Sequence, residues 1–169
     1  MARVYVSIGS NLEPLRYIRA GLADMQQHFG ALTLSSVYES EAVGFEGDNF
    51  YNLVAGFDTD MEVHAVVRTL RLIENNNERK RTSNRFSART LDLDMVLYDD
   101  LILKDEEVKV PRDEITKYAF VLLPLAEIAP DVKHPLTKQR LADLAQAFDN
   151  KGQSLWQVEV SVISHQNEK

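Results

Sequence analysis

The order of the segments with strand and helix periodicity is the feature that most narrows what this chain can fold into. Val4, Val6 and Ile8 stand at alternate positions, which is typical of a strand with one buried face. Residues 10–13 then have the spacing of a helix-capping box, and apolar residues recur at helical intervals through residues 15–29. The chain is therefore predicted to begin with a strand, a turn and a helix.

The same succession continues toward the middle of the chain. Strand patterns cover residues 32–38 and 49–57, Thr59 and Glu62 have the spacing of a second capping box, and helical periodicity follows. A further strand is expected at residues 91–97. This β-α-β-β-α-β order predicts an α+β, ferredoxin-like sandwich with a largely antiparallel sheet, its helices on one face and its other face free to hold ligands.

Alternation within a strand predicts which of its side chains share a face. In the strand at residues 91–97, the core is expected to receive Leu91, Leu93, Met95 and Leu97, and the opposite face Asp92, Asp94 and Val96. In the strand at residues 49–57, Phe50 and Asn52 fall on one face. The two aspartates are thus expected on one surface, outside the core.

The rest of the chain is expected to form an extended C-terminal segment. A short helix is predicted around residues 141–148, and an alternating run at residues 156–162 is either an added edge strand or a dimer contact. The chain has 169 residues, which is enough to bury one substantial core. We therefore expect residues 1–169 to form a single domain.

Charge and composition exclude several classes of function. The net charge of −7 disfavours general nucleic-acid binding, and the lack of cysteine excludes disulfides, thiolate metal sites and cysteine nucleophiles. The first residues do not resemble a signal peptide, and no apolar run is long enough to cross a bilayer. We expect a cytoplasmic monomer or weak homodimer that has no nucleic-acid or membrane partner.

Asp92 and Asp94 are the first candidates for a chemical role. Because the two residues are two positions apart in a strand, their carboxylates emerge on one face, separated along the chain by roughly 7 Å. Carboxylate oxygens favour magnesium, and two magnesium ions about 3.5–4 Å apart are typical of phosphoryl-transfer sites. The alternative is an ordinary solvated strand face. In the absence of clustered histidine or cysteine, a magnesium site is the chemistry that this pair favours.

A basic segment directly precedes these aspartates. It contains Arg79, Lys80, Arg81, Arg85 and Arg89. Guanidinium groups bind phosphate oxygens in a bidentate way, so a phosphate-binding loop would lie beside a metal site, although charge runs are often only solvated. Because no glycine-rich phosphate-binding loop is present, the phosphates must be held mainly by side chains and metal.

A second group of residues would suit a flat heteroaromatic ring as the substrate that accepts the phosphate group. Phe50 and Asn52 share a strand face, and Phe120 is able to approach from the later segment. Two aromatic rings can sandwich a planar ligand while an amide hydrogen-bonds to its edge. The alternative for these residues is ordinary core packing.

Two segments have the motifs of a known family, residues 89–96 (Arg-Thr-Leu-Asp-Leu-Asp-Met-Val) and residues 9–12 (Gly-Ser-Asn-Leu) after the first strand. They carry a resemblance to the 6-hydroxymethyl-7,8-dihydropterin pyrophosphokinases of folate synthesis. It is supported by Asn52, Pro111 and residues 120–130 (Phe-Val-Leu-Leu-Pro-Leu-Ala-Glu-Ile-Ala-Pro), and it runs in register from about Val4 to Pro130.

The resemblance implies a ferredoxin-like fold, magnesium, and transfer of pyrophosphate from ATP to a reduced hydroxymethyl pterin with release of AMP. It implies magnesium ligation, with two ions, by Asp92 and Asp94, and catalytic roles for Asp94, Asp92, Arg89 and Arg79. The ATP-binding residues would be Glu74, Arg79, Arg81, Arg89 and Arg112. The pterin-binding residues would be Ser40, Val43, Phe50, Asn52 and Phe120.

The chain departs from the family pattern at four positions. Ser87 replaces a small residue, Ala88 a common proline, Arg112 a histidine that contacts the nucleotide, and Tyr118 an arginine. Arg112 keeps a positive donor at its position, and Lys117 is a candidate to replace the lost arginine. The changes leave a second hypothesis open, a non-catalytic paralogue that binds a pterin or a nucleotide. A third, an RNA-binding ferredoxin-like module, suits the fold but not the acidic charge.

Overall fold

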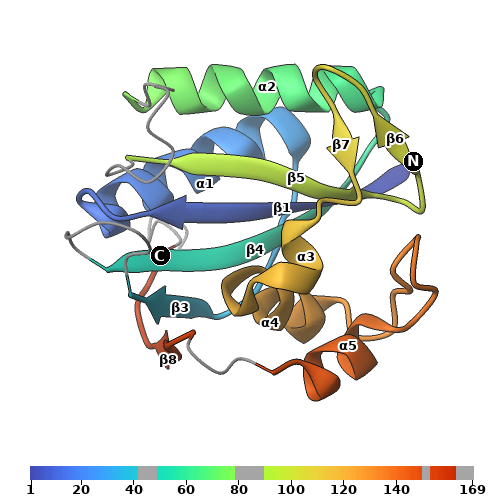
Figure 1. The fold of residues 1–169 in the computed structure, drawn as a ribbon. Helices are drawn as coiled ribbons and strands as arrows, with labels where there is room; N and C mark the ends of the chain where they lie inside the picture. The colour runs from blue at the N-terminus through green and yellow to red at the C-terminus, as the bar shows by residue number, and fades with distance from the viewer. Residues whose placement is uncertain (42–48, 79–89, 150–152, 163–169) are drawn as a thin grey trace.

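The computed structural model describes residues 1–41, 49–78, 90–149 and 153–162. Within these ranges the main sheet has six strands, and every strand pair in it is antiparallel. Its order is β5 (Asp92–Tyr98), β1 (Ala2–Ser10), β4 (Phe50–Thr59), β3 (Val37–Ser40) and β8 (Leu155–Val158), and β2 (Thr33–Leu34) also pairs with β4. The long strands β5, β1 and β4 lie side by side, with β5 at one edge of the sheet in the described residues (Figure 1).

Two helices cover one face of this sheet, namely α1 (Pro14–Phe29) and α2 (Val63–Asn76). Their buried residues join the alternating side chains of β1, β4 and β5 in the main core, where the Phe29 ring stacks on Phe57 with centroids 4.2 Å apart. The order of elements is the predicted one, except that the strand expected at residues 32–38 is divided into β2 and β3. This order and the helix-covered face confirm the α+β, ferredoxin-like prediction.

Both predicted capping boxes are wrong in detail. Residues 10–13 do not cap α1, because Ser10 still belongs to β1, and the helix begins at Pro14 after Glu13 in a left-handed conformation (φ 43°). At α2 the N-cap is Glu62, whose carboxylate accepts hydrogen bonds from the amides of His64 and Ala65. Thr59 instead ends β4, which remains paired with β1 to its last residue.

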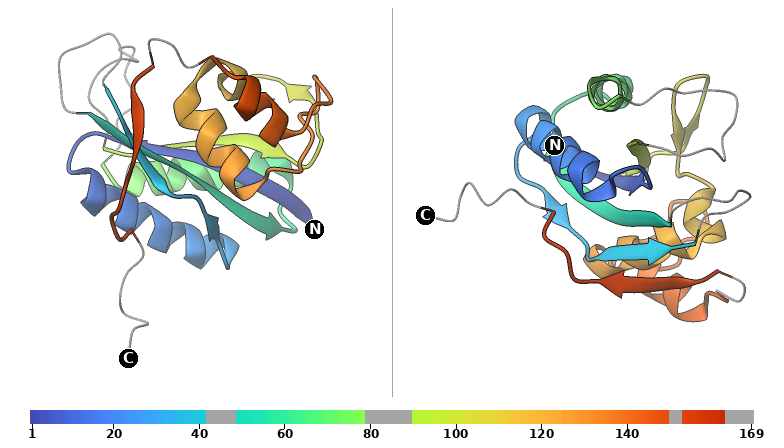
Figure 2. Two further views of the ribbon diagram at one scale, coloured as in Figure 1. Left: turned by 90° about the horizontal axis from the view of Figure 1, so that it is seen from below. Right: turned by 90° about the vertical axis from the view of Figure 1, so that its left-hand side faces the viewer.

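The sequence predicted that the other face of the sheet is free to hold ligands. In the structure, part of this face is covered. The C-terminal segment forms α3 (Glu114–Lys117), α4 (Ala119–Ile128) and α5 (Leu141–Ala147), which build a second core on Tyr5 and Val54. Figure 2 shows the sheet between α1 and α2 on one side and α4 and α5 on the other. The mostly apolar composition of α4 explains why the chain covers this surface: its side chains are buried against the sheet and α5.

A β-bulge changes the face on which the end of β5 presents its side chains. Tyr5 pairs with Leu97 and the next residue, Val6, pairs with Met95, so one extra residue, Val96, enters β5. Leu93 and Met95 face the main core as predicted, but Leu97 joins the second core. The prediction for Leu97 is therefore wrong, because simple alternation does not continue through a bulge.

The C-terminal run confirms the edge-strand alternative. β8 pairs with β3, with Val37 opposite Val158, and Val162 beyond it is buried in the main core. Arg19 of α1 donates a hydrogen bond to the carbonyl of Ser161 at 2.7 Å. A separate hairpin consists of β6 (Leu103–Lys104) and β7 (Lys109–Val110). No helix in the described ranges is long and apolar enough to span a bilayer.

Candidate active site

Three polar residues and one glycine, from four neighbouring strands, form a row on the second face of the sheet. In the pairing register, Asp92 of β5 lies opposite Gly9 of β1, which lies opposite Asn52 of β4. Tyr38 of β3 continues this row, because it pairs with Asn52. The register therefore places the metal-binding candidate and the pterin-binding candidate on either side of one glycine.

Gly9 lies close to the side chain of the pterin-binding candidate Asn52. A Cβ atom at this position would lie 3.2 Å from the Asn52 side-chain oxygen and 4.0 Å from Cδ1 of Phe50. A side chain there would push against the amide that is predicted to bind the edge of the pterin. A residue larger than glycine would thus make a tight contact across the strands, and the Asn52 side chain would have to shift by a few tenths of an ångström.

The two aspartates occupy equivalent faces of β5, as the sequence predicted. Asp94 lies opposite Ser7, two residues from the pairing of Asp92 with Gly9, and both side chains are partly exposed. Magnesium commonly takes one or two carboxylates and completes its coordination with water and substrate phosphates. The pair fits such an ion, and the described residues contain no larger cluster of histidine, cysteine, aspartate or glutamate.

Arg71 is a site residue that the sequence analysis missed. Its Nη2 atom lies 3.3 Å from Oδ1 of Asp94, and its Nη1 donates to the Leu93 carbonyl at 3.0 Å. Nη1 also contacts Oε1 of Glu74 at 2.7 Å. The spacing of Arg71 and Glu74 along one helix was a visible signal for their pairing, but the contact with Asp94 depends on how α2 packs across β5.

Glu74 lies beneath this cluster and is almost completely buried, with 1% of its side chain exposed. Leu93 is the residue between the two aspartates, and its backbone amide donates a hydrogen bond to Oε2 of Glu74 at 2.7 Å. Glu74 therefore links α2 to the aspartate strand. Its expected place around the nucleotide remains a prediction.

Ser40, Phe50 and Asn52, three of the predicted pterin-binding residues, lie together on β3 and β4, and Phe120 lies on α4. Asn52 is buried, and its amide nitrogen donates to the hydroxyl of Ser40 at 3.0 Å. Phe50 pairs with Ser40 across β3 and β4. Phe120 comes from the first turn of α4, where its half-buried ring stacks on that of Tyr118 with centroids 5.0 Å apart and planes 20° from parallel.

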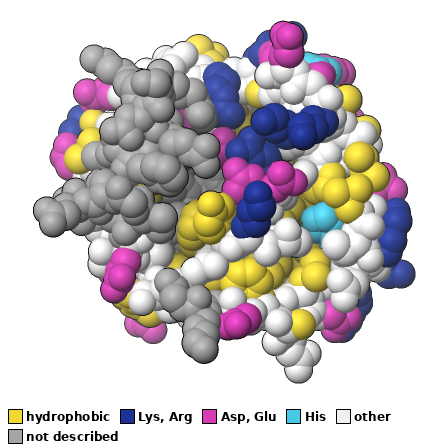
Figure 3. Space-filling model, viewed as in Figure 1, with side chains coloured by type: hydrophobic (Ala, Val, Ile, Leu, Met, Phe, Trp, Pro, Cys, Tyr) yellow, Lys and Arg dark blue, Asp and Glu magenta, His cyan; other side chains and the backbone are white. Residues whose placement is uncertain are grey.

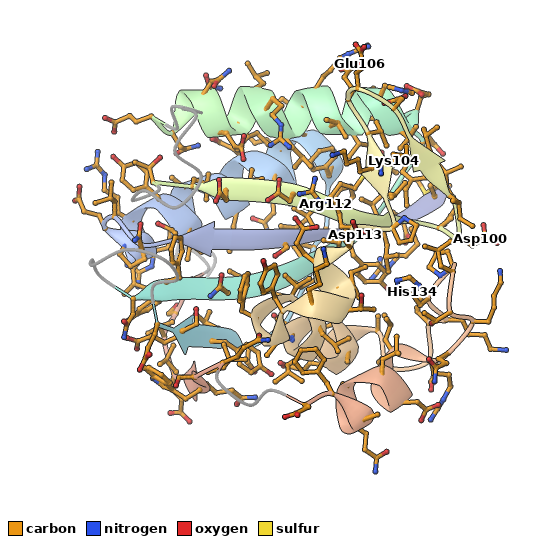
Figure 4. The ribbon with its side chains drawn as sticks, in the orientation of Figure 1. Asp100, Lys104, Glu106, Arg112, Asp113 and His134 are labelled. Carbon is orange, nitrogen blue, oxygen red and sulfur yellow. The ribbon has the colours of Figure 1, made fainter. Side chains whose placement is uncertain are left out.

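Arg112 follows β7 and is tied to the bulged end of β5, since its backbone amide donates to the Val96 carbonyl at 3.1 Å. Its guanidinium group contacts the Glu114 carboxylate at two points, Nη2 to Oε2 at 2.8 Å and Nε to Oε1 at 3.3 Å. Figure 4 labels Arg112 beside β5, next to Asp113. Figure 3 shows acidic and basic side chains gathered in the middle of this side of the molecule.

Several predicted positions lie outside the described residues. They are Val43 of the pterin set, the departures Ser87 and Ala88, and the whole basic segment, namely Arg79, Lys80, Arg81, Arg85 and Arg89. The described part of the site thus contains the two aspartates, the pterin-edge residues and their supports.

Known proteins resemble this chain in sequence. Residues 5–130 match the family model for 7,8-dihydro-6-hydroxymethylpterin-pyrophosphokinase. The chain is 32% identical over 145 residues to the 2-amino-4-hydroxy-6-hydroxymethyldihydropteridine pyrophosphokinase of Aquifex aeolicus, covering 85% of this chain and 90% of that protein. It is 37% identical over 137 residues to the protein of the same name from Pseudomonas aeruginosa, covering 79% and 84%.

Solved structures show the same fold. A crystal structure of Plasmodium falciparum HPPK-DHPS aligns with a TM-score of 0.66 over 86% of this chain, at 13% sequence identity. This chain spans 42% of the length of that chain. On the family model and the close relatives together, the chain belongs to the 7,8-dihydro-6-hydroxymethylpterin-pyrophosphokinase family.

Proposed function

We propose that this protein transfers a pyrophosphoryl group from ATP to the hydroxymethyl group of 6-hydroxymethyl-7,8-dihydropterin and releases AMP. The observation that carries the proposal is the register of the sheet, in which Asp92, Gly9 and Asn52 lie in one row across three strands. This register supports a site in which metal-bound phosphate would lie beside the edge of a planar ring. Family membership supplies the identity of both substrates.

In the proposed reaction the hydroxymethyl oxygen attacks the β-phosphorus of ATP in line with the departing AMP. A bond forms between that oxygen and the β-phosphorus, the bond from the β-phosphorus to the bridging oxygen of AMP breaks, and the hydroxyl proton is released. Magnesium, with two ions proposed at Asp92 and Asp94, would neutralise charge on the phosphate oxygens. Catalysis then consists chiefly of positioning and electrostatic stabilisation.

Different residues would bind the pterin and the nucleotide. Asn52, Ser40 and Val43 would bind the pterin edge, while the rings of Phe50 and Phe120 would enclose its faces. Arg79, Arg81, Arg89 and Arg112, with Glu74, would bind the nucleotide, and Arg79 and Arg89 would contact the transferring group.

One observation favours the non-catalytic paralogue as a second candidate. The side chains at two of the departure positions make contacts within the protein: Arg112 pairs with Glu114, and Tyr118 stacks on Phe120. A paralogue of this kind would bind the pterin or the nucleotide without releasing AMP. The RNA-binding alternative is less favoured, because α4 covers part of the sheet surface on which RNA bases would stack.

The experiment mixes the protein with ATP, magnesium and the reduced hydroxymethyl pterin and separates the nucleotides by chromatography. AMP is expected for the wild type. Asp94→Asn is expected to abolish turnover with an unchanged circular dichroism spectrum, whereas Asp100→Asn, in the exposed turn after the same strand, should retain it. ADP in place of AMP would replace the mechanism with monophosphoryl transfer. Binding by calorimetry without AMP would select the paralogue.

We further infer that residues 1–169 act as one pyrophosphokinase domain. The support is that β8 pairs with β3 and that Val162 is buried in the main core, so the C-terminal segment is part of the same sheet and core as β1. The monomeric or weakly dimeric state remains a prediction, which sedimentation of the purified protein would test.

A further inference from the structure

The first turn of α4 is held by a residue that lies far along the chain. The N-cap residue of α4, Tyr118, makes no capping hydrogen bond with its side chain. Instead, the amide of Ala119 donates to Oε1 of Gln153 at 2.8 Å, and Nε2 of Gln153 donates to the Lys117 carbonyl at 3.1 Å. One carboxamide thus binds the backbone on both sides of Tyr118.

This double contact fixes the junction between α3 and α4. The first amides of a helix have no partner within the helix, so an external acceptor at Ala119 defines where α4 begins. Phe120 is the next residue, and its ring stacks on Tyr118, whose own backbone lies between the two contacts. Gln153 therefore binds the backbone directly before the residue that carries the Phe120 ring.

The segment that carries Gln153 also contacts the opposite side of the proposed pterin site. Leu155 of β8 pairs with Ser40 of β3, and Nε2 of Gln157 donates to the hydroxyl of Tyr38 at 3.1 Å. Tyr38 pairs in turn with Asn52. A short stretch of residues 153–157 is thus linked both to the aromatic residue on α4 and to the strand that holds the polar edge-binding residues.

We propose that Gln153 is a positioning residue for pterin binding, which sets the ring of Phe120 relative to Asn52 and Ser40. This proposal rests on the proposed function, because it assigns Phe120, Asn52 and Ser40 to the pterin. Gln153 does not contact the reacting groups; it acts through the backbone of the α3–α4 junction. Its loss should therefore affect the pterin far more than ATP.

The test compares the wild type with Gln153→Met, which keeps the length of the side chain and removes both hydrogen bonds. The KM for the pterin is expected to rise about tenfold, the size of effect that loss of a net hydrogen bond produces, with the KM for ATP and kcat within about twofold of wild type. The dissociation constant of the pterin, measured by calorimetry with a non-hydrolysable ATP analogue, should rise by the same factor.

Two further variants separate positioning from general stability. Gln153→Glu retains an acceptor for Ala119 but no donor for Lys117, so it should restore part of the pterin affinity. Gln27→Met, on the exposed surface of α1, removes an equivalent side chain from the opposite side of the sheet and should change nothing. Emission of Trp156, the single tryptophan, should stay as in the wild type if β8 remains in place.

The possible results are distinct. Unchanged pterin parameters in Gln153→Met, with an active wild type, would overturn the proposal and leave the proposed function standing. An equal loss in pterin affinity, ATP affinity and kcat, together with a lower melting temperature, would also overturn it and make Gln153 a purely structural residue. A wild type that neither releases AMP nor binds pterin would reject the proposed function and this proposal together.

Discussion

The guanidinium group of Arg71 lies 3.3 Å from the carboxylate of Asp94, so a side chain of α2 contacts one of the two residues proposed to bind magnesium. The same guanidinium forms an ion pair with the buried Glu74, whose carboxylate accepts a hydrogen bond from the backbone amide of Leu93. The aspartate strand is therefore fastened to α2 through a charged network, and the positive charge beside Asp94 acts on any cation that binds there.

Arg71→Met should make the protein less stable and yet bind magnesium more tightly. Loss of the Glu74 contact should lower the free energy of unfolding by roughly 1–3 kcal/mol, since Glu74 is buried. Arg71 competes with magnesium for the Asp94 carboxylate, so its removal should tighten the binding of magnesium alone. The increase in affinity should be about fivefold, because the attraction between Arg71 and Asp94 is weak at a partly exposed site. Thermal unfolding and calorimetry without nucleotide measure the two effects.

Arg68→Met is the matched control for this prediction. Arg68 lies one turn earlier on α2 and makes a two-point contact with Glu107, but both side chains are exposed. Exposed pairs contribute only about 0–1 kcal/mol, so this variant should show a small change in stability and none in magnesium affinity. Weaker magnesium binding by Arg71→Met would instead mean that Arg71 orients Asp94.

Gly9→Ala should weaken pterin binding. The new methyl group would lie 3.2 Å from the oxygen of the Asn52 amide, which is buried and bonded to Ser40 and so has little room to move. A displacement of a few tenths of an ångström should raise the KM for the pterin roughly three- to tenfold. Steady-state kinetics with each substrate varied in turn would measure this.

Gly30→Ala provides the comparison, because it changes a glycine of the opposite kind. Gly30 has φ 84° and open space around it, so the added methyl group costs backbone strain, roughly 1 kcal/mol or more, without touching the site. This variant should melt at a lower temperature with both KM values intact. Similar kinetics for the two alanine variants would argue that the Asn52 contact does not matter.

His64 should make stability depend on pH. Its Nδ1 lies 2.6 Å from Glu62 and its Nε2 lies 2.7 Å from Asp105, in the turn between β6 and β7, so both nitrogens donate only when the ring is protonated. The hydrogen bond to Glu62 and then that to Asp105 raise the pKa of His64 above its usual 6.5. The hydrogen bond from His64 is the main cause that lowers the pKa of Asp105 from 3.8 to about 2.

The signs define the pH window. A raised histidine pKa gives stability that is complete below the unfolded-state pKa near 6.5 and disappears as pH rises through the folded-state pKa. The lowered pKa of Asp105 gives stability that is present above 3.8 and disappears as pH falls toward 2. His64→Gln should therefore lower the melting temperature most between these limits, near pH 5.5, and least near pH 9.

Asp105→Asn tests the partner in this prediction. It should reduce the pH dependence of the wild type, and it should have little further effect in the His64→Gln protein, because the two side chains act as a pair. A difference between wild type and His64→Gln that is constant from pH 5.5 to pH 9 would contradict the assignment.

The sequence predicted the features that local periodicity controls. The strand and helix order and the shared face of Asp92 and Asp94 follow from alternation, and both are present in the structure. The caps at Ser10 and Thr59 were wrong because pairing with a neighbouring strand extends β1 and β4 to those residues. The spacing of residues in the sequence does not show how far β1 and β4 pair with each other.

Other features depend on packing between segments that are distant in sequence. Arg71 reaches Asp94 only because α2 lies across β5, and Gln153 reaches Ala119 only because β8 returns to the edge of the sheet. The second core on Tyr5 was also missed, since the apolar pattern of α4 does not state which surface it will cover. These contacts required the tertiary structure.

The bulge at Val96 has a consequence for how the protein can change over evolution. Through it, one strand presents Asp92 and Asp94 and then, on the same side of the sheet, the apolar Leu97. The proposed metal-binding residues and a packed apolar core thus occupy adjacent parts of a single surface. Substitutions in α5 can therefore accumulate without altering the alternation that brings Asp92 and Asp94 to one face.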